Sequence, residues 1–108
     1  MIFKCEVGNM IKIAKTHDIP EGEVRSFVVD NEMVAVFNIN NEYYALKDQC
    51  SHMELPLSDG LVDGDIVTCA YHGAEFEIKT GKVLCLPAVE PVENYKVMIE
   101  GDDIYIDL

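Results

Sequence analysis

Short runs of alternating apolar and polar residues make up much of the chain. The segment EVRSFVVDNEMVAVFNINNEYYALKD is dense in Val, Phe, Tyr and Ile, and DNE and NINNE interrupt it with turn residues. This pattern predicts three short strands joined by tight turns. DIVTC and EFEI predict two more strands, and KTGK predicts the turn after the second. The last segment, YKVMIEGDDIYIDL, predicts a hairpin that turns at Gly101 and Asp102. Its final strand would place three side chains on one face: Ile104, Ile106 and Leu108.

No segment has a convincing helical period, and Thr16–Pro20 could form a single turn at most. Seven or more short strands at close spacing predict an all-β antiparallel sandwich or barrel. Residues 1–9 precede a natural-looking start at Met10. We therefore expect a domain over residues 10–108, preceded by an extension or extra strand over residues 1–9.

Composition narrows the possible partners. The chain has 108 residues, enough for one domain, and 49% of them are apolar, enough for a packed core. Its formal net charge of -12 argues against binding to nucleic acid or to an anionic membrane, because both require basic side chains. The sequence shows no signal peptide and no membrane span, so we expect a cytoplasmic protein.

Two short motifs, the first and the second clip, each combine one Cys with one His. Cys50-x-His52 and Cys69-x-x-His72 are separated by 16 residues, and each clip follows a predicted strand. Thiolate and neutral imidazole are metal ligands, and loops at strand ends can hold them in fixed positions. The other two cysteines, Cys5 and Cys85, are expected to be free thiols.

Three interpretations of the clips remain open on the residues alone. They could be ordinary core or surface residues, although two mixed clips rarely coincide by chance. They could form a structural zinc site, but zinc motifs usually pair Cys with Cys and His with His. They could also hold a two-iron, two-sulfide cluster, in which each loop sends its Cys to one iron and its His to the other.

The sequence resembles the Rieske iron–sulfur proteins over about residues 10–108. CSH followed by CAYHG is similar to the family signature Cys-x-His…Cys-x-x-His-Gly. LPLSDGLVDGDIVTC resembles the linker between the clips of Rieske ferredoxins, and AEFEIKTGKVLCLPAVEPVENYKVMIEGDDIYIDL resembles the stretch after the second clip. DIPEGEVRSFVV is similar to the opening strands. The resemblance implies a β-sandwich or barrel with a small cluster-binding subdomain of two loops, at about residues 47–88.

The resemblance also implies a ligand set and a function. Cys50 and Cys69 would bind one iron of a single [2Fe-2S] cluster, and His52 and His72 would bind the other. Family members that catalyse oxygenation carry a further iron, for which this chain has only His17 to spare. The resemblance thus implies a non-enzymatic, one-electron carrier of an aromatic-ring oxygenase system. It would be a monomer that receives electrons from a flavin-dependent ferredoxin reductase and passes them to a terminal oxygenase. The small subunit of a nitrite reductase remains an alternative, as does the zinc module.

The resemblance predicts a low reduction potential. High-potential members have a disulfide between the cluster loops and Ser and Tyr hydroxyls that donate to cluster sulfurs. The matching positions here are Leu55, Tyr71, Ala74 and Phe76, which supply none of these. We therefore expect a potential near the low end of the family range, about -150 mV.

Acidic residues cluster around the clips. No Lys or Arg occurs from residue 48 to 78, and seven acids do: Asp48, Glu54, Asp59, Asp63, Asp65, Glu75 and Glu77. Of these, Glu54, Glu75 and Glu77 are the candidates for steering a basic partner, although the acids could equally form a merely solvated face. Several apolar residues are expected to shield the cluster: Met53, Leu55, Pro56, Tyr71 and Pro87.

Overall fold

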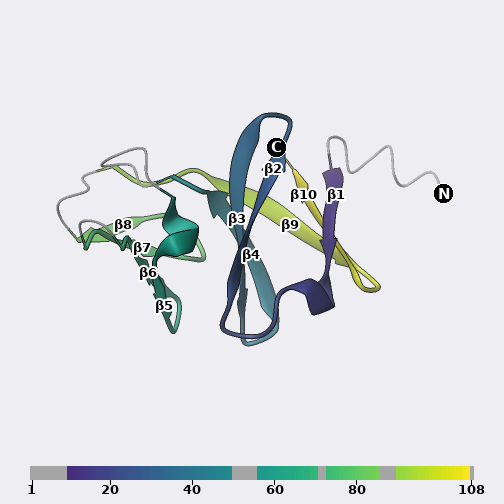
Figure 1. Cartoon of the computed structure of the whole chain (residues 1–108), viewed down its shortest axis with the longest axis horizontal. Coiled ribbons are helices and arrows are strands. Elements are labelled where there is room, and N and C mark those ends of the chain that lie inside the picture. Colours follow the sequence, from purple (N-terminus) through teal and green to yellow (C-terminus); the bar gives the residue numbers. More distant parts are fainter. Residues whose placement is uncertain (1–9, 50–55, 71–72, 86–89, 108) are drawn as a thin grey trace.

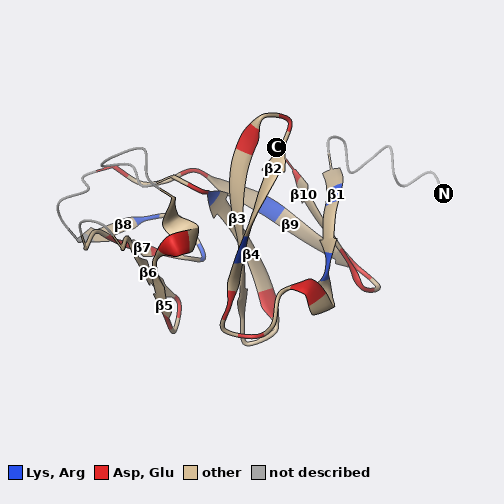
Figure 2. Cartoon of the chain, viewed as in Figure 1, with Lys and Arg blue, Asp and Glu red and all other residues tan. Residues whose placement is uncertain are grey.

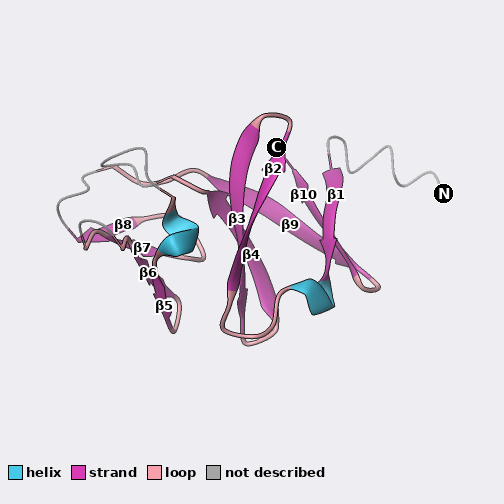
Figure 3. Ribbon diagram, viewed as in Figure 1, coloured by secondary structure: helices cyan, strands magenta, loops and turns pink. Residues whose placement is uncertain are grey.

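The computed structural model describes residues 10–49, 56–70, 73–85 and 90–107, without the Cys85 side chain. The described part contains ten strands and two 3-10 turns (Figures 1 and 3). In chain order they are β1 Met10–Lys15, η1 Thr16–Asp18, β2 Val24–Val29, β3 Glu32–Ile39, β4 Glu42–Lys47, η2 Leu57–Asp59, β5 Leu61–Asp63, β6 Ile66–Thr68, β7 Glu75–Glu77, β8 Val83–Cys85, β9 Asn94–Glu100 and β10 Asp103–Asp107.

Six strands form one sheet in the order β1-β10-β9-β4-β3-β2, and every pair in it is antiparallel. Two of its hairpins turn on two residues with left-handed backbone, Asp30-Asn31 and Asn40-Asn41. Short polar side chains tolerate that conformation, and such turns match the twist of the strands they join. The C-terminal hairpin turns at Gly101-Asp102. These turns lie where the sequence predicts them.

The remaining four strands form a smaller antiparallel sheet in the order β5-β6-β7-β8. The chain leaves the large sheet after β4 and returns to it at β9, so the small sheet is an insertion that lies to one side (Figure 1). This arrangement places the start of β5, the end of β6, the start of β7 and the end of β8 at the same end of the small sheet.

Two clusters of buried side chains hold the sheets together. The inner core lies within the large sheet and contains Ala14, Ile19, Val29, Val34, Val36, Ala45, Ile104 and Ile106. Both edge strands, β1 and β2, contribute to it, so the sheet curls toward a barrel. The inter-sheet core lies between the two sheets and contains Ala35, Phe37, Ile39, Leu46, Leu57, Val67, Cys69, Ala74, Phe76, Ile78 and Val92.

Strand β3 separates the two cores. Val34 and Val36 face the inner core, while Ala35 and Phe37 face the inter-sheet core, and all four side chains are fully buried. A strand buried on both faces reads as a continuous apolar run, as VAVF does here. The small sheet is thereby packed against a rigid strand of the large one.

The all-β antiparallel prediction is confirmed. The five predicted strands upstream of residue 90 correspond to β2, β3, β4, β6 and β7, and Thr16–Asp18 forms the single predicted turn. Ile104 and Ile106 are buried on one face as predicted, while Leu108 lies outside the described residues. The sequence pattern did not reveal β1, β5, β8 or η2. In the described part of the chain, no helix has the length and apolar character needed to cross a membrane.

Candidate metal centre

Cys69 is the one predicted ligand that the structure describes. It follows the last residue of β6, and its side chain is 1% exposed. Its thiol is free rather than part of a disulfide. Cys50, His52 and His72 lie outside the described residues, as does Glu54. Within the described ranges, no group of three or more His, Cys, Asp and Glu side chains is placed to hold a metal ion.

The loop that begins at Cys69 is closed by its own backbone. The Cys69 N–H donates to the Ala74 carbonyl at 2.7 Å, and the Gly73 N–H donates to the Cys69 carbonyl at 3.0 Å. Gly73 has a φ of 77°, a left-handed conformation that glycine adopts without strain. The chain therefore reverses between β6 and β7, and Cys69 is brought next to Ala74.

The surroundings of Cys69 are apolar. Ala74 and Phe76 are both fully buried and belong, with Cys69, to the inter-sheet core. The two positions at which high-potential relatives would carry hydroxyl donors are thus filled by a methyl group and a phenyl ring. Neither side chain can donate a hydrogen bond to sulfur.

A buried carboxylate lies just before the first clip. Asp48 is 3% exposed, and its Oδ1 accepts from the Ser58 N–H while its Oδ2 accepts from the Ser58 hydroxyl, both at 2.7 Å. The Asp48 N–H in turn donates to the Met33 carbonyl at 2.8 Å. The sequence left open that all seven acids of residues 48–78 form a solvated face. Asp48 is buried and therefore does not belong to such a face. A carboxylate that accepts two hydrogen bonds can be buried at this position.

A close backbone contact joins the first loop to the second. The Gly60 N–H donates to the Leu57 carbonyl at 2.9 Å, which ends η2. A Cβ atom added to Gly60 would overlap the carbonyl oxygen of Thr68, the residue directly before Cys69. In the sequence, LSDG belongs to the stretch that resembles Rieske ferredoxins, and no local pattern there indicates a role for Ser58 or Gly60. Ser58 and Asp48 are ten residues apart, so a local sequence pattern does not indicate that they are in contact.

A second glycine contact joins the β7–β8 turn to the residues just before β9. Gly81 has a φ of 82°, and a Cβ atom there would overlap the carbonyl oxygen of Val92. The Val92 N–H donates to the Gly81 carbonyl at 2.9 Å. Pro87 lies outside the described residues. Of the predicted shielding residues, Pro56 is described, and it is half-buried.

Some of the described acids lie close to Cys69 and others lie at the opposite end of the small sheet. Glu75 begins β7, directly after the Cys69 loop, whereas Glu77 ends it and accepts a hydrogen bond from the Thr80 hydroxyl at 2.6 Å. Asp63 and Asp65 are exposed at the β5–β6 turn, at the other end of β6 from Cys69. Figure 2 shows acidic segments on η2, on β7 and at this turn.

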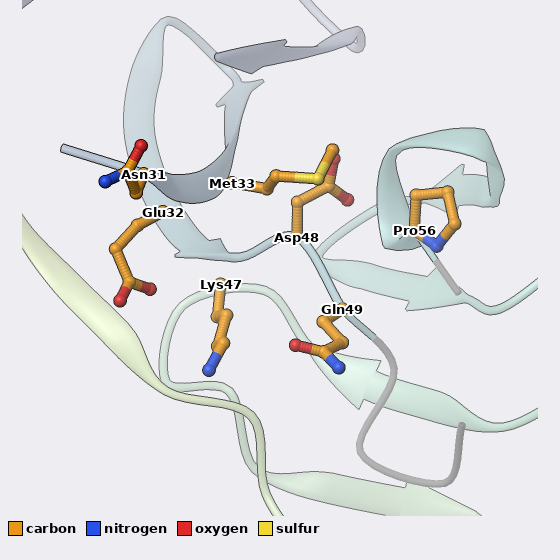
Figure 4. Close-up of a pocket in the computed structure, with 7 residues that line it drawn as sticks. All are labelled: Asn31, Glu32, Met33, Lys47, Asp48, Gln49 and Pro56. Atoms are coloured by element: carbon orange, nitrogen blue, oxygen red, sulfur yellow. The ribbon is translucent and has the colours of Figure 1, made fainter. Parts of the chain in front are cut away.

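A surface pocket of about 360 Å³ lies beside Asp48 and Gln49, the last described residues before the first clip (Figure 4). Its lining residues are Asn31, Glu32, Met33, Lys47, Asp48, Gln49 and Pro56. Figure 4 shows the Asp48 carboxylate pointing away from the Lys47 ammonium, which lies on the opposite side of the pocket. Lys47 places a cation directly before the span that has no basic residue in the sequence.

The described residues fit an iron–sulfur cluster. A cluster of this type takes thiolate ligands that are shielded from water, and Cys69 is a free, buried cysteine on a short turn with apolar neighbours. The Asp48–Ser58 and Gly60–Thr68 contacts connect the residues that flank the first clip to the residue directly before the second clip. These observations are what a cluster shared by two loops requires.

Comparison with known proteins identifies the family. The family model described as "Rieske [2Fe-2S] domain" matches residues 9–96. The chain belongs to the Rieske [2Fe-2S] family. It therefore carries one Rieske-type [2Fe-2S] cluster and serves as an electron carrier rather than as an enzyme. The comparisons favour this interpretation over the zinc module.

Individual relatives agree with the family. The chain is 44% identical over 101 residues to the 3-phenylpropionate/cinnamic acid dioxygenase ferredoxin subunit of Escherichia coli (strain K12), which covers 93% of this chain and 94% of the relative. Among solved structures, the ferredoxin of carbazole 1,9a-dioxygenase from Nocardioides aromaticivorans IC177 superposes with a TM-score of 0.88 at 28% identity, over 93% of this chain and 98% of that one. A ferredoxin chain in a complex of reduced oxygenase and oxidized ferredoxin in carbazole 1,9a-dioxygenase gives a TM-score of 0.86 at 28% identity, covering 92% and 93%.

Proposed function

We propose that this ferredoxin receives single electrons from a flavin-dependent reductase and delivers them to the terminal oxygenase of an aromatic-ring oxygenase system. The observation that carries the proposal is the 44% identity to a dioxygenase ferredoxin subunit along nearly the whole of both chains. The likeness to a ferredoxin that forms a complex with its oxygenase supports the same role.

We propose that the ligands are Cys50 and Cys69 on one iron and His52 and His72 on the other, within a cluster-binding part at about residues 47–88. The bound cluster supplies one reversible electron, with no site for substrate. The burial of the Cys69 side chain, beside a turn closed by its own backbone, supports this proposal. The domain would occupy residues 10–108, with residues 1–9 as an extension or extra strand.

The chain's own residues would set the conditions for electron transfer. Leu57, Ala74 and Phe76 keep water away from the Cys69 sulfur, and they offer it no hydroxyl donor. Hydrogen bonds to sulfur favour the reduced state, so their absence at these positions keeps the reduction potential low. A low potential suits a donor to an oxygenase.

Partner recognition would depend on charge. The net charge of -12 favours partners that present Lys or Arg, and it disfavours anionic membranes and nucleic acid. Glu75 stands next to the Cys69 loop, where a partner must approach for electron transfer. We expect a monomer that works in the cytoplasm and forms short-lived complexes, because a shuttle must release each partner.

Reconstitution tests the proposed function. The purified ferredoxin would be combined with a flavin-dependent ferredoxin reductase and an aromatic-ring oxygenase from the same genome, with NADH and candidate aromatic acids. Product formation should require the ferredoxin. Turnover that proceeds equally well without it would contradict the proposal, as would a ferredoxin that the reductase cannot reduce.

A further inference from the structure

Asp48 makes contacts that its place in the sequence does not explain. It directly follows β4 and stands two residues before Cys50. Both of its carboxylate oxygens accept hydrogen bonds from the same residue, Ser58, at 2.7 Å. Hydrogen bonds to an ionised carboxylate are stronger than those between neutral groups. These hydrogen bonds therefore hold Asp48 and Ser58 together, ten residues apart in the sequence.

The same contacts continue to the second loop. Ser58 is part of η2, whose Leu57 is fully buried in the inter-sheet core together with Cys69. Gly60 ends η2 and lies so close to the Thr68 carbonyl that a methyl group there would overlap it. Thr68 is the last residue of β6, and Cys69 follows it. A continuous set of contacts thus runs from Asp48, two residues before the first clip, to Thr68, directly before the second clip.

We propose that Asp48, Ser58, Gly60 and Thr68 form a set of contacts, here called the loop clamp. The loop clamp holds the two ligand-bearing loops at a fixed position relative to each other and so retains the cluster. The inference rests on the proposed ligands. Asp48 is a positioning residue in this account, since it acts through Ser58. It also places a buried negative charge before the first clip, which opposes the addition of an electron.

Geometry and charge can be separated at Asp48. In Asp48→Asn, the amide oxygen can still accept from the Ser58 N–H, and the amide nitrogen can donate to the Ser58 hydroxyl oxygen. This variant keeps the clamp and removes the charge. Asp48→Ala removes both and leaves the Ser58 N–H buried without its acceptor. Ser58→Ala removes the hydroxyl contact alone, and Ser58→Thr restores a hydroxyl.

The experiment measures cluster loss, reduction potential and amide exchange. Loss is followed as the decay of visible absorbance in excess chelator. We expect Asp48→Ala to lose the cluster at least about tenfold faster than wild type, and Ser58→Ala to lose it faster by a smaller factor. Ser58→Thr and Asp48→Asn should lose it at a rate within about threefold of the wild-type rate. Asp48→Asn should raise the midpoint potential. In the apo-protein, the Ser58 amide should exchange faster in Asp48→Ala than in wild type.

A matched control distinguishes the clamp from general destabilisation. Ile104→Val removes a methylene from a fully buried side chain in the inner core, away from the loops. Cluster loss is compared among variants as a function of their unfolding midpoints in urea. Cluster loss in Asp48→Ala and Ser58→Ala that exceeds the Ile104→Val trend supports the clamp. If Ser58→Ala and Ser58→Thr lose the cluster equally fast and on that trend, the clamp is overturned while the electron-carrier function stands. A wild-type protein without iron would overturn both.

Discussion

The backbone N–H of Cys69 donates to the carbonyl oxygen of Ala74 at 2.7 Å, and both side chains are buried in the inter-sheet core. This contact places position 74 beside a predicted cluster ligand. A side chain introduced there can act directly on the environment of the Cys69 sulfur.

The first prediction concerns the reduction potential. Ala74→Ser combined with Phe76→Tyr introduces two hydroxyl groups near Cys69, and a donor to sulfur stabilises the reduced state. We expect a rise in midpoint potential on the order of 60 mV, which is a tenfold change in a one-electron equilibrium. A redox titration measures it. Ala45→Ser is the control, since Ala45 is 1% exposed but lies in the inner core. An equal shift in this control would contradict the explanation, as would a wild-type potential above roughly +100 mV.

The second prediction concerns the turn at Gly81. Gly81→Ala should destabilise the protein for two reasons, a left-handed φ of 82° and overlap with the Val92 carbonyl. Gly22 has a φ of 83° with open space around it, so Gly22→Ala carries the conformational cost alone. We expect Gly22→Ala to cost about 1–2 kcal/mol and Gly81→Ala clearly more. Urea unfolding measures both. Equal losses would show that the Val92 contact relaxes without cost.

The sequence revealed those features whose causes are local. The Asp30-Asn31 and Asn40-Asn41 turns were predictable because short polar residues mark left-handed positions. Strand β1 was not, because its partner β10 lies at the opposite end of the chain. Strands β5 and β8 have only three residues each, too few for an alternating pattern to be distinctive.

The candidate site was predictable in its ligand types but not in its support. Cysteine and histidine at fixed spacing indicate their chemistry directly. Asp48 reads as one more acid in an acidic span, and nothing nearby in the sequence shows that its side chain points inward to Ser58. The role of Gly60 depends on the approach of another strand, which composition does not encode.

The third prediction concerns association. Reduction by the cognate reductase should slow as salt rises from roughly 20 to 300 mM, because the Debye length shrinks. Glu54→Gln with Glu75→Gln should lower the association rate. Asp63→Asn with Asp65→Asn changes the net charge equally at the far end of β6 and should lower it less. Stopped-flow reduction measures the rates. Indifference to salt and to both pairs would indicate that apolar residues such as Pro56 carry the docking.

The fourth prediction concerns alkaline pH. Burial, with the nearby carboxylates of Glu93 and Glu32, raises the pKa of Tyr95 to about 12 from an ordinary value of 10.0. Between these values the folded state retains a proton that the unfolded state releases, so stability is lost as pH rises through this window. Tyr95→Phe should lack this component of the loss. Urea unfolding at a series of pH values tests it, and parallel pH profiles for the two proteins would contradict it.

Iron and acid-labile sulfide analysis of a set of variants tests the proposed ligand set. Wild type should hold about two irons and two sulfides per chain. Cys50→Ser, His52→Cys, Cys69→Ser and His72→Cys should each lower that content or alter the visible spectrum, whereas Cys5→Ser and Cys85→Ser should leave both unchanged. One zinc with no iron in the wild type would contradict the account, and so would loss of the cluster in Cys85→Ser.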